Sequence, residues 1–158
     1  VGPAALSLIL GVGALGGVLG AVTFGRVVAR FGLGRSSAVA PLTFAFGLLI
    51  YPTATGGPVV AALLMLLAAV VSTVGIVWAD IALGSVLAQE VPDAMRARVA
   101  GAYRTVNYGV RPCGAVIGGV ITTAIDPRTT LLISALGAMV GAALRLRRPI
   151  LRLALEDT

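Results

Sequence analysis

The sequence contains no histidine, a single cysteine and only six acidic residues among its 158 positions. The absence of histidine removes the commonest general base and the commonest metal ligand. The lone cysteine, Cys113, excludes a disulfide framework, and its place in an apolar segment argues against a reactive thiol. The intramembrane acid-rich patterns of a membrane enzyme are also missing. We therefore expect no enzymatic activity, no catalytic residue, no metal site and no cofactor.

Charge of either sign is scarce, and apolar residues dominate. Hydrophobic residues make up 58% of the chain and charged residues 11%, and the mean hydropathy is +1.04. A soluble domain of this length needs far less apolar surface to fill one core. The excess is expected to face lipid, so the composition predicts an all-α integral membrane protein whose first partner is the lipid bilayer.

Proline and glycine divide the apolar sequence into segments long enough to cross a hydrocarbon core of about 30 Å. Pro92 should end one helix, and Asp93 is expected to cap the next. We treat residues 1–158 as one helical bundle. Its five predicted transmembrane helices cover residues 4–24, 38–54, 59–89, 95–125 and 129–144.

All twelve basic residues are arginine, and the five predicted spans place ten of them on one side. Arg128 lies in the opposite loops, and Arg111 lies within a span. Cytoplasmic loops carry such an excess, so we expect a multi-pass protein of the plasma (inner) membrane, with the N-terminus outside and the C-terminus cytoplasmic. The ten arginines are Arg26, Arg30, Arg35, Arg96, Arg98, Arg104, Arg145, Arg147, Arg148 and Arg152.

The net charge of +6 also raises the possibility of nucleic-acid binding. The arginines separate the predicted spans, however, and no aromatic stacking surface accompanies them. We expect no nucleic-acid partner.

Glycines recur four residues apart within the apolar segments. Residues 11–16 match the pattern GxGxxG, but they follow no strand and lack an acidic residue about twenty positions later, so a dinucleotide site is not predicted. Small residues at this spacing let helices approach closely, and lining a substrate path is the alternative. The pairs are Gly13 and Gly17, Gly16 and Gly20, Gly114 and Gly118, and Gly137 and Gly141.

Residues 25–35 resemble the cytoplasmic signature loop of the major facilitator superfamily. Arg26 and Arg30 follow the end of an apolar segment, where basic side chains interact favourably with helix carbonyls. Gly32 and Gly34 can adopt the left-handed conformation that a tight reversal needs. One position departs from the family pattern, because Ala29 stands where these proteins usually have an aspartate. The residues that carry the resemblance are Gly25, Arg26, Arg30, Gly32 and Arg35.

A longer stretch, residues 89–119, is similar to the tenth and eleventh helices of the drug and siderophore exporters in that superfamily, the macrolide-efflux-like and enterobactin-exporter-like branch. The resemblance implies that the five spans correspond to helices eight to twelve of a twelve-helix fold. It also implies efflux of a small-molecule substrate by alternating access. The implied partners are a proton, as the coupling ion, and a missing N-terminal half of the transporter. The alternative is a truncated or structural multi-pass membrane protein without transport activity of its own.

Four polar residues inside the predicted spans are candidates for a substrate pathway: Asp80, Arg104, Asn107 and Arg111. With Pro92 at the apex of a helical hairpin, Asp80 and Arg104 each lie twelve residues away, so both should sit about 18 Å from the turn. Their equal distance from the turn predicts an ion pair between Asp80 and Arg104. The alternative is that the Asp80 carboxylate is unpaired and hydrated at the cytoplasmic opening of the pathway. Arg111 should lie about 10 Å deeper and face the cavity, unless it packs against a helix or reaches toward the lipid surface.

Overall fold

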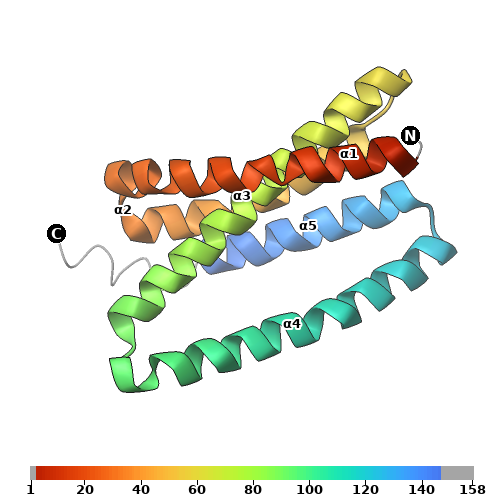
Figure 1. Ribbon diagram of the computed structural model, residues 1–158. Helices are drawn as coiled ribbons and strands as arrows, with labels where there is room; N and C mark the ends of the chain where they lie inside the picture. Colours follow the sequence, from red (N-terminus) through yellow and green to blue (C-terminus); the bar gives the residue numbers. More distant parts are fainter. Residues whose placement is uncertain (1–2, 147–158) are drawn as a thin grey trace.

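The computed structural model describes residues 3–146, and over that range the chain is built of helices and short turns (Figure 1). The prediction of an all-α fold is confirmed. The predicted basic tail with Arg147, Arg148 and Arg152, and both chain ends, lie outside the described residues. The elements are α1 (Pro3–Gly13), α2 (Leu15–Ile50), the 3₁₀ turn η1 (Tyr51–Thr53), α3 (Pro58–Glu90), α4 (Asp93–Ala124) and α5 (Pro127–Leu146).

Helix α2 consists of two arms that reverse direction at Gly32. The backbone of this glycine has φ 78° and ψ 160°, while the residues on either side are helical. Only glycine adopts this conformation without a steric penalty from Cβ. The hydroxyl of the fully buried Ser36 donates a hydrogen bond to the Gly32 carbonyl at 2.6 Å. Helix α1 continues into the first arm after a short break at Ala14, so α1 and the two arms of α2 correspond to the first two predicted segments.

Helix α3 lies against both arms of α2. On the first arm, a Cβ added at Gly16 would lie 2.6 Å from the Val70 carbonyl oxygen, and one added at Gly20 would lie 3.3 Å from the Val74 backbone. Residue numbers increase in the same direction along both helices, so the first arm and α3 run parallel. The glycine spacing in this arm therefore serves close helix packing, as its sequence indicates.

The second arm of α2 runs antiparallel to α3 and packs equally closely. A Cβ at Gly47 would lie 2.6 Å from the Ser72 backbone nitrogen, and Gly75 of α3 lies directly against the backbone of Phe44. The buried residues of these elements are mostly alanine, glycine and serine, such as Ala68. Small side chains thus bring three helical segments close together, and little space remains between their backbones.

Three helical stretches are long and apolar enough to cross a membrane: Ser7–Thr53, Pro58–Glu90 and Pro127–Leu144. The first contains the reversal at Gly32 and hence two helical arms. Helix α4 is not among them, because several arginines and glycines lower its hydropathy. The structure thus supports a membrane protein with three candidate spanning stretches, whereas the assignment of five spans remains a prediction.

The connections gather at two ends of the molecule. Figure 1 shows the reversal of α2 and the α3–α4 turn at one end, and the η1 loop and the α4–α5 turn at the other. Helix α4 buries none of its residues and stands apart from the other helices for most of its length (Figure 1). It also contains Pro112, which lacks the backbone N–H that would bond the preceding turn.

The prediction that Asp93 caps α4 is wrong. Pro92 occupies the cap position, and its carbonyl oxygen accepts hydrogen bonds from the backbone nitrogens of Met95 and Arg96 at 2.9 and 3.1 Å. The helix therefore begins one residue earlier than a capping Asp93 requires. Asp93 lies in the first turn, where its carboxylate forms an ion pair with Arg96 at 2.7 Å.

The capping aspartate of the structure is instead Asp126, before α5. Its carboxylate accepts hydrogen bonds from the backbone nitrogens of Arg128 and Thr129 at 3.0 and 3.1 Å, and from the Thr129 hydroxyl at 2.5 Å. Pro127 occupies the first helical position, where a missing N–H costs nothing. The dipeptide Asp126-Pro127 thus ends α4 and starts α5 within two residues.

Candidate functional site

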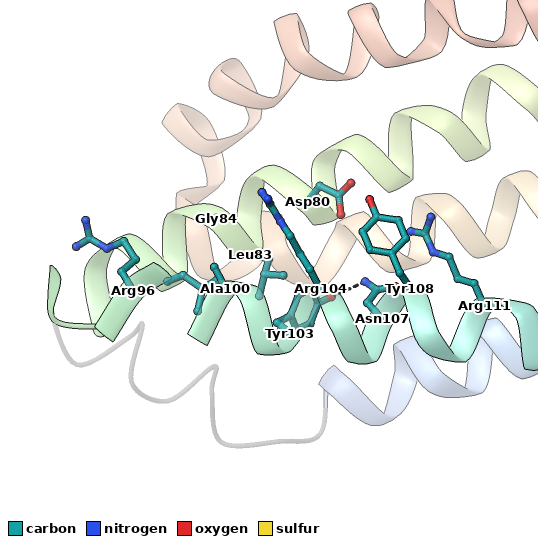
Figure 2. Close-up of a pocket in the computed structure, with 11 residues that line it drawn as sticks. Asp80, Leu83, Gly84, Arg96, Ala100, Tyr103, Arg104, Asn107, Tyr108 and Arg111 are labelled. Carbon is teal, nitrogen blue, oxygen red and sulfur yellow. Dashed lines mark hydrogen bonds between the residues drawn. The ribbon is translucent and has the colours of Figure 1, made fainter. Parts of the chain in front are cut away.

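A groove of about 410 Å³ lies between α3 and α4. Figure 2 shows that α3 contributes one wall and α4 the other. The four residues singled out from the sequence all line it: Asp80 from α3, and Arg104, Asn107 and Arg111 from α4. Among them, only Asn107 is partly buried, so the groove is open on one side.

The polar wall follows from the residue spacing in α4. Residues separated by three, four or seven positions lie on the same face of an α-helix. Arg104, Asn107, Tyr108 and Arg111 fit this spacing and line the groove together. At 1.5 Å per residue, Arg104 and Arg111 are about 10 Å apart along the helix axis. The two guanidinium groups therefore mark the ends of a polar strip about two helical turns long.

Asp80 points from α3 toward α4, on the side of Arg104 and Tyr108 (Figure 2). No ion pair joins Asp80 to an arginine in the described part of the chain, where the Asp93–Arg96 pair is the only one. The helices diverge from their common turn, so residues at equal depth face each other across an open space. The expected ion pair of Asp80 with Arg104 is thus not formed, although both residues line the same groove.

Aromatic side chains hold two of the polar groups in the groove. The guanidinium of Arg111 lies 4.6 Å from the centre of the Tyr108 ring, within the range of a cation–π contact. The Asn107 amide nitrogen donates a hydrogen bond to the Tyr103 hydroxyl at 3.1 Å. The Arg111 guanidinium donates no hydrogen bond to another described residue, so its N–H groups remain available. Tyr108 lies four residues after Arg104 and three before Arg111, and Tyr103 lies four residues before Asn107. Helical spacing could therefore have placed both tyrosines beside the groove, although neither was among the predicted site residues.

Arg96 closes the groove at the α3–α4 turn. Its Nη2 donates hydrogen bonds to the carbonyl oxygens of Ala88 at 2.8 Å and Val91 at 3.3 Å, in addition to the ion pair with Asp93. These carbonyls belong to the end of α3, where the helix leaves them without intrahelical partners. One side chain therefore joins the end of α3 to the beginning of α4. From the sequence, Arg96 is expected only to mark the cytoplasmic side.

The residues of the predicted signature loop lie away from this groove, on both sides of the reversal of α2. Arg26 donates a long hydrogen bond of 3.4 Å to the Val22 carbonyl, and the Arg30 guanidinium lies 5.7 Å from the ring centre of Phe31. Gly32, with its positive φ, makes the reversal as predicted, whereas Gly34 is helical, so the left-handed conformation expected of Gly34 is not found. None of the five loop residues, Gly25, Arg26, Arg30, Gly32 and Arg35, lines the groove.

Comparisons with known proteins give no match, either to a protein-family model, to a curated protein or to a solved structure. Within the described residues there is also no group of three histidine, cysteine, aspartate or glutamate residues that could hold a metal ion. Indications of function therefore come from the groove, from the apolar helices around it and from the resemblance carried by residues 25–35 and 89–119.

Proposed function

We propose that the chain is the C-terminal portion of a secondary active efflux transporter of the major facilitator superfamily, in the drug and siderophore exporter branch. In this proposal the complete transporter exports a small molecule across the plasma membrane in exchange for protons, and the present chain has its N-terminus outside and its C-terminus in the cytoplasm. The observation that supports it most is the polar groove between α3 and α4 in an otherwise apolar helical chain. Charged residues inside membrane spans are costly and usually mark a transport pathway.

The exposure of α4 also supports the proposal. A long helix that buries none of its residues gains little stability from packing within the chain, so a further packing partner is expected. The groove-lining face of α4 continues past Arg111 with Gly114 and Gly118, which meet open space in the described structure. Transporters of this kind hold substrate between two helical bundles near the bilayer midplane. We assign the open face of α4 to contact with the N-terminal half, and the groove to one wall of the substrate site.

The test compares the full gene product with the present chain in bacteria that lack their own drug exporters. The full gene product should raise the resistance of these bacteria to at least one compound in a panel of toxic compounds. Inverted membrane vesicles that contain it should accumulate the same compound when a proton gradient is applied. Residues 1–158 alone should give neither effect, because they supply one wall of the site. An uncoupler that collapses the gradient should abolish the uptake.

Two matched variants connect the activity to the groove. Arg111→Gln removes a charge that lines it, whereas Arg98→Gln removes the same charge from the same helix at a position outside the lining. Uptake should fall at least tenfold in the first variant and stay within twofold in the second. Uptake that is unaffected by the uncoupler, or transport by residues 1–158 alone, would contradict the proposal and favour a different role for this membrane protein.

A further inference from the structure

The groove between α3 and α4 carries an excess of positive charge, and this excess indicates the kind of substrate it accepts. Asp80, Arg96, Arg104 and Arg111 are the charged residues that line it. Arg96 is compensated by its ion pair with Asp93 at 2.7 Å. Two arginines then face one carboxylate, and the groove retains one unit of net positive charge.

Neither Arg104 nor Arg111 has a carboxylate within ion-pair distance in the described chain. No hydrogen bond from either guanidinium to another described residue is present, and the one specific contact is the cation–π contact of Arg111 with the Tyr108 ring at 4.6 Å. Both side chains are exposed to the groove. Their N–H edges are therefore available for a ligand, and a guanidinium edge matches the paired oxygens of a carboxylate.

Arg111 lies near the middle of α4, eighteen residues after Asp93 and thirteen before Ala124. If α4 crosses the bilayer, this position places the charge far from both aqueous surfaces. A charge at that depth requires a partner or water. An anion bound in the groove would provide the missing partner, whereas a cation would add to the repulsion.

We propose that the groove binds an organic anion, in which a carboxylate is attached to a flat, unsaturated ring. The carboxylate lies between Arg104 and Arg111, the Asn107 amide supplies a further hydrogen bond, and the ring packs against the exposed faces of Tyr103 and Tyr108. Asp80 on the opposite wall weakens the binding of the anion by like-charge repulsion. This inference names the substrate class of the proposed exporter and so depends on that proposed function.

The experiment measures equilibrium binding to the purified full gene product in phosphatidylcholine nanodiscs, with empty nanodiscs as the background. The probes are benzene, naphthalene and indole rings, each prepared as a carboxylate, a carboxamide and an aminomethyl cation. At least one carboxylate should bind tenfold or more tightly than its carboxamide, and the matching cation should bind most weakly. The absence of such a preference on all three rings would overturn the inference.

Four substitutions separate an electrostatic site from a structural effect. Arg104→Gln and Arg111→Gln should each weaken carboxylate binding about tenfold and leave carboxamide binding within twofold. Asp80→Asn should tighten carboxylate binding, a change opposite to the one that damage to the fold produces. Arg98→Gln, the matched control on the same helix, should leave both affinities unchanged, and an equal loss in this variant would contradict a specific site.

Two further outcomes identify where the inference fails. If phosphatidylglycerol in the nanodiscs abolishes carboxylate binding, the arginines hold a lipid headgroup and the substrate class is wrong. If vesicles transport cations or neutral compounds but no carboxylate, the exporter proposal survives and the anion inference does not. Carboxylate binding without transport of any compound would instead retain the anion site and contradict the exporter proposal.

Discussion

The indole nitrogen of Trp78 donates a hydrogen bond to the carbonyl oxygen of Gly20 at 3.0 Å. The same nitrogen lies 3.2 Å from the hydroxyl oxygen of Thr23, one turn further along the first arm of α2. The rings of Trp78 and Phe24 are 6.3 Å apart, in a tilted arrangement typical of aromatic pairs. Polar and aromatic contacts thus join α3 to the first arm where both run parallel.

Removal of this indole N–H should destabilise the α2–α3 unit. Trp78→Phe keeps an aromatic ring beside Phe24 but loses the donor, and the expected loss in unfolding free energy is about 1 kcal/mol. The measurement is unfolding in detergent micelles with increasing sodium dodecyl sulfate. Tyr108→Phe is the control, because the Tyr108 hydroxyl has no hydrogen bond to another described residue and its side chain is 61% exposed. A Trp78→Phe variant as stable as Tyr108→Phe would show that the bond contributes nothing.

Two glycines of α3 should respond in opposite directions to alanine. Gly75 packs directly on the Phe44 backbone, whereas Gly84 has no atom within 4 Å of an added Cβ. Gly75→Ala should cost about 1–3 kcal/mol, because backbone atoms cannot move aside as a flexible side chain can. Gly84→Ala should be neutral or stabilising by up to about 1 kcal/mol, since alanine favours the helix. The same unfolding assay tests both, and equal stability of the two variants would contradict the packing of α3.

The hydrogen bonds of Arg96 at the α3–α4 turn should contribute more to the free energy of unfolding than its ion pair with Asp93 does. Arg96→Gln loses the charge-assisted bonds to the Ala88 and Val91 carbonyls and should cost about 1 kcal/mol, given a side chain that is 42% exposed. Asp93→Asn removes only an exposed ion pair and should cost less than about 0.5 kcal/mol. Hydrogen exchange of the Val91 amide, which bonds the Leu87 carbonyl, reports the turn directly. Faster exchange in Asp93→Asn than in Arg96→Gln would reverse this ranking.

The cap at the start of α5 should make stability depend on acid pH. Hydrogen bonds from the Thr129 hydroxyl and backbone nitrogen hold the pKa of Asp126 below its usual 3.8. A lowered folded-state pKa means that the ionised carboxylate stabilises the fold above the unfolded pKa. This contribution is lost as pH falls through the lowered value.

Asp126→Ala should therefore melt at a lower temperature than the unmodified chain near pH 7, and the difference should shrink as pH falls below about 4. Asp126→Asn retains a side-chain oxygen that can accept one cap hydrogen bond. Its melting temperature should therefore lie between those of Asp126→Ala and the unmodified chain. Thermal melting followed by circular dichroism across this pH range checks the trend. A difference between the alanine variant and the unmodified chain that stays constant to pH 2 would exclude the ionised cap as its cause.

Single cysteines test the proposed orientation. Thr55, in the loop after η1, and Gln89, at the end of α3, are both exposed, and Figure 1 shows this loop and this helix end at opposite ends of the molecule. In a Cys113→Ser background, an impermeant maleimide should label Thr55→Cys in intact cells, but Gln89→Cys only after the membrane is permeabilised. The reverse pattern would place the arginine-rich end outside. Ser36 is unsuitable for this assay because its side chain is fully buried.

Helix breaks were predictable wherever the local backbone chemistry decides them. Proline removes a donor and clashes with the preceding turn, so the break at Pro92 could be located within one or two residues. The choice of cap was harder, because Asp93 and Asp126 both adjoin a proline. The order of proline and aspartate distinguishes the two sites. Proline fits directly after a capping aspartate, as in Asp126-Pro127, and Thr129 lies three residues beyond that cap.

The groove was predictable as a set of residues but not as a shape. Helical spacing places Arg104, Asn107 and Arg111 on one face of α4, whereas the divergence of α4 from α3 depends on packing between distant segments. Identical glycine spacings also have different outcomes. Gly16 and Gly20 meet the α3 backbone, but an added Cβ at the glycines of α4 and α5 would meet open space in the described structure. A pattern of small residues permits a close approach and does not identify the neighbour.

The separation of α4 from its neighbours has a mechanical consequence. A helix that is joined to the bundle mainly through its two end turns can bend or swing without breaking side-chain packing along its length. Pro112 leaves the Tyr108 carbonyl without its usual helical donor, which lowers the resistance to bending one residue beyond Arg111. The width of the groove then depends on the geometry of the two end turns and on any bend near Pro112, so a rotation at the Arg96 turn would change the distance between Arg111 and α3.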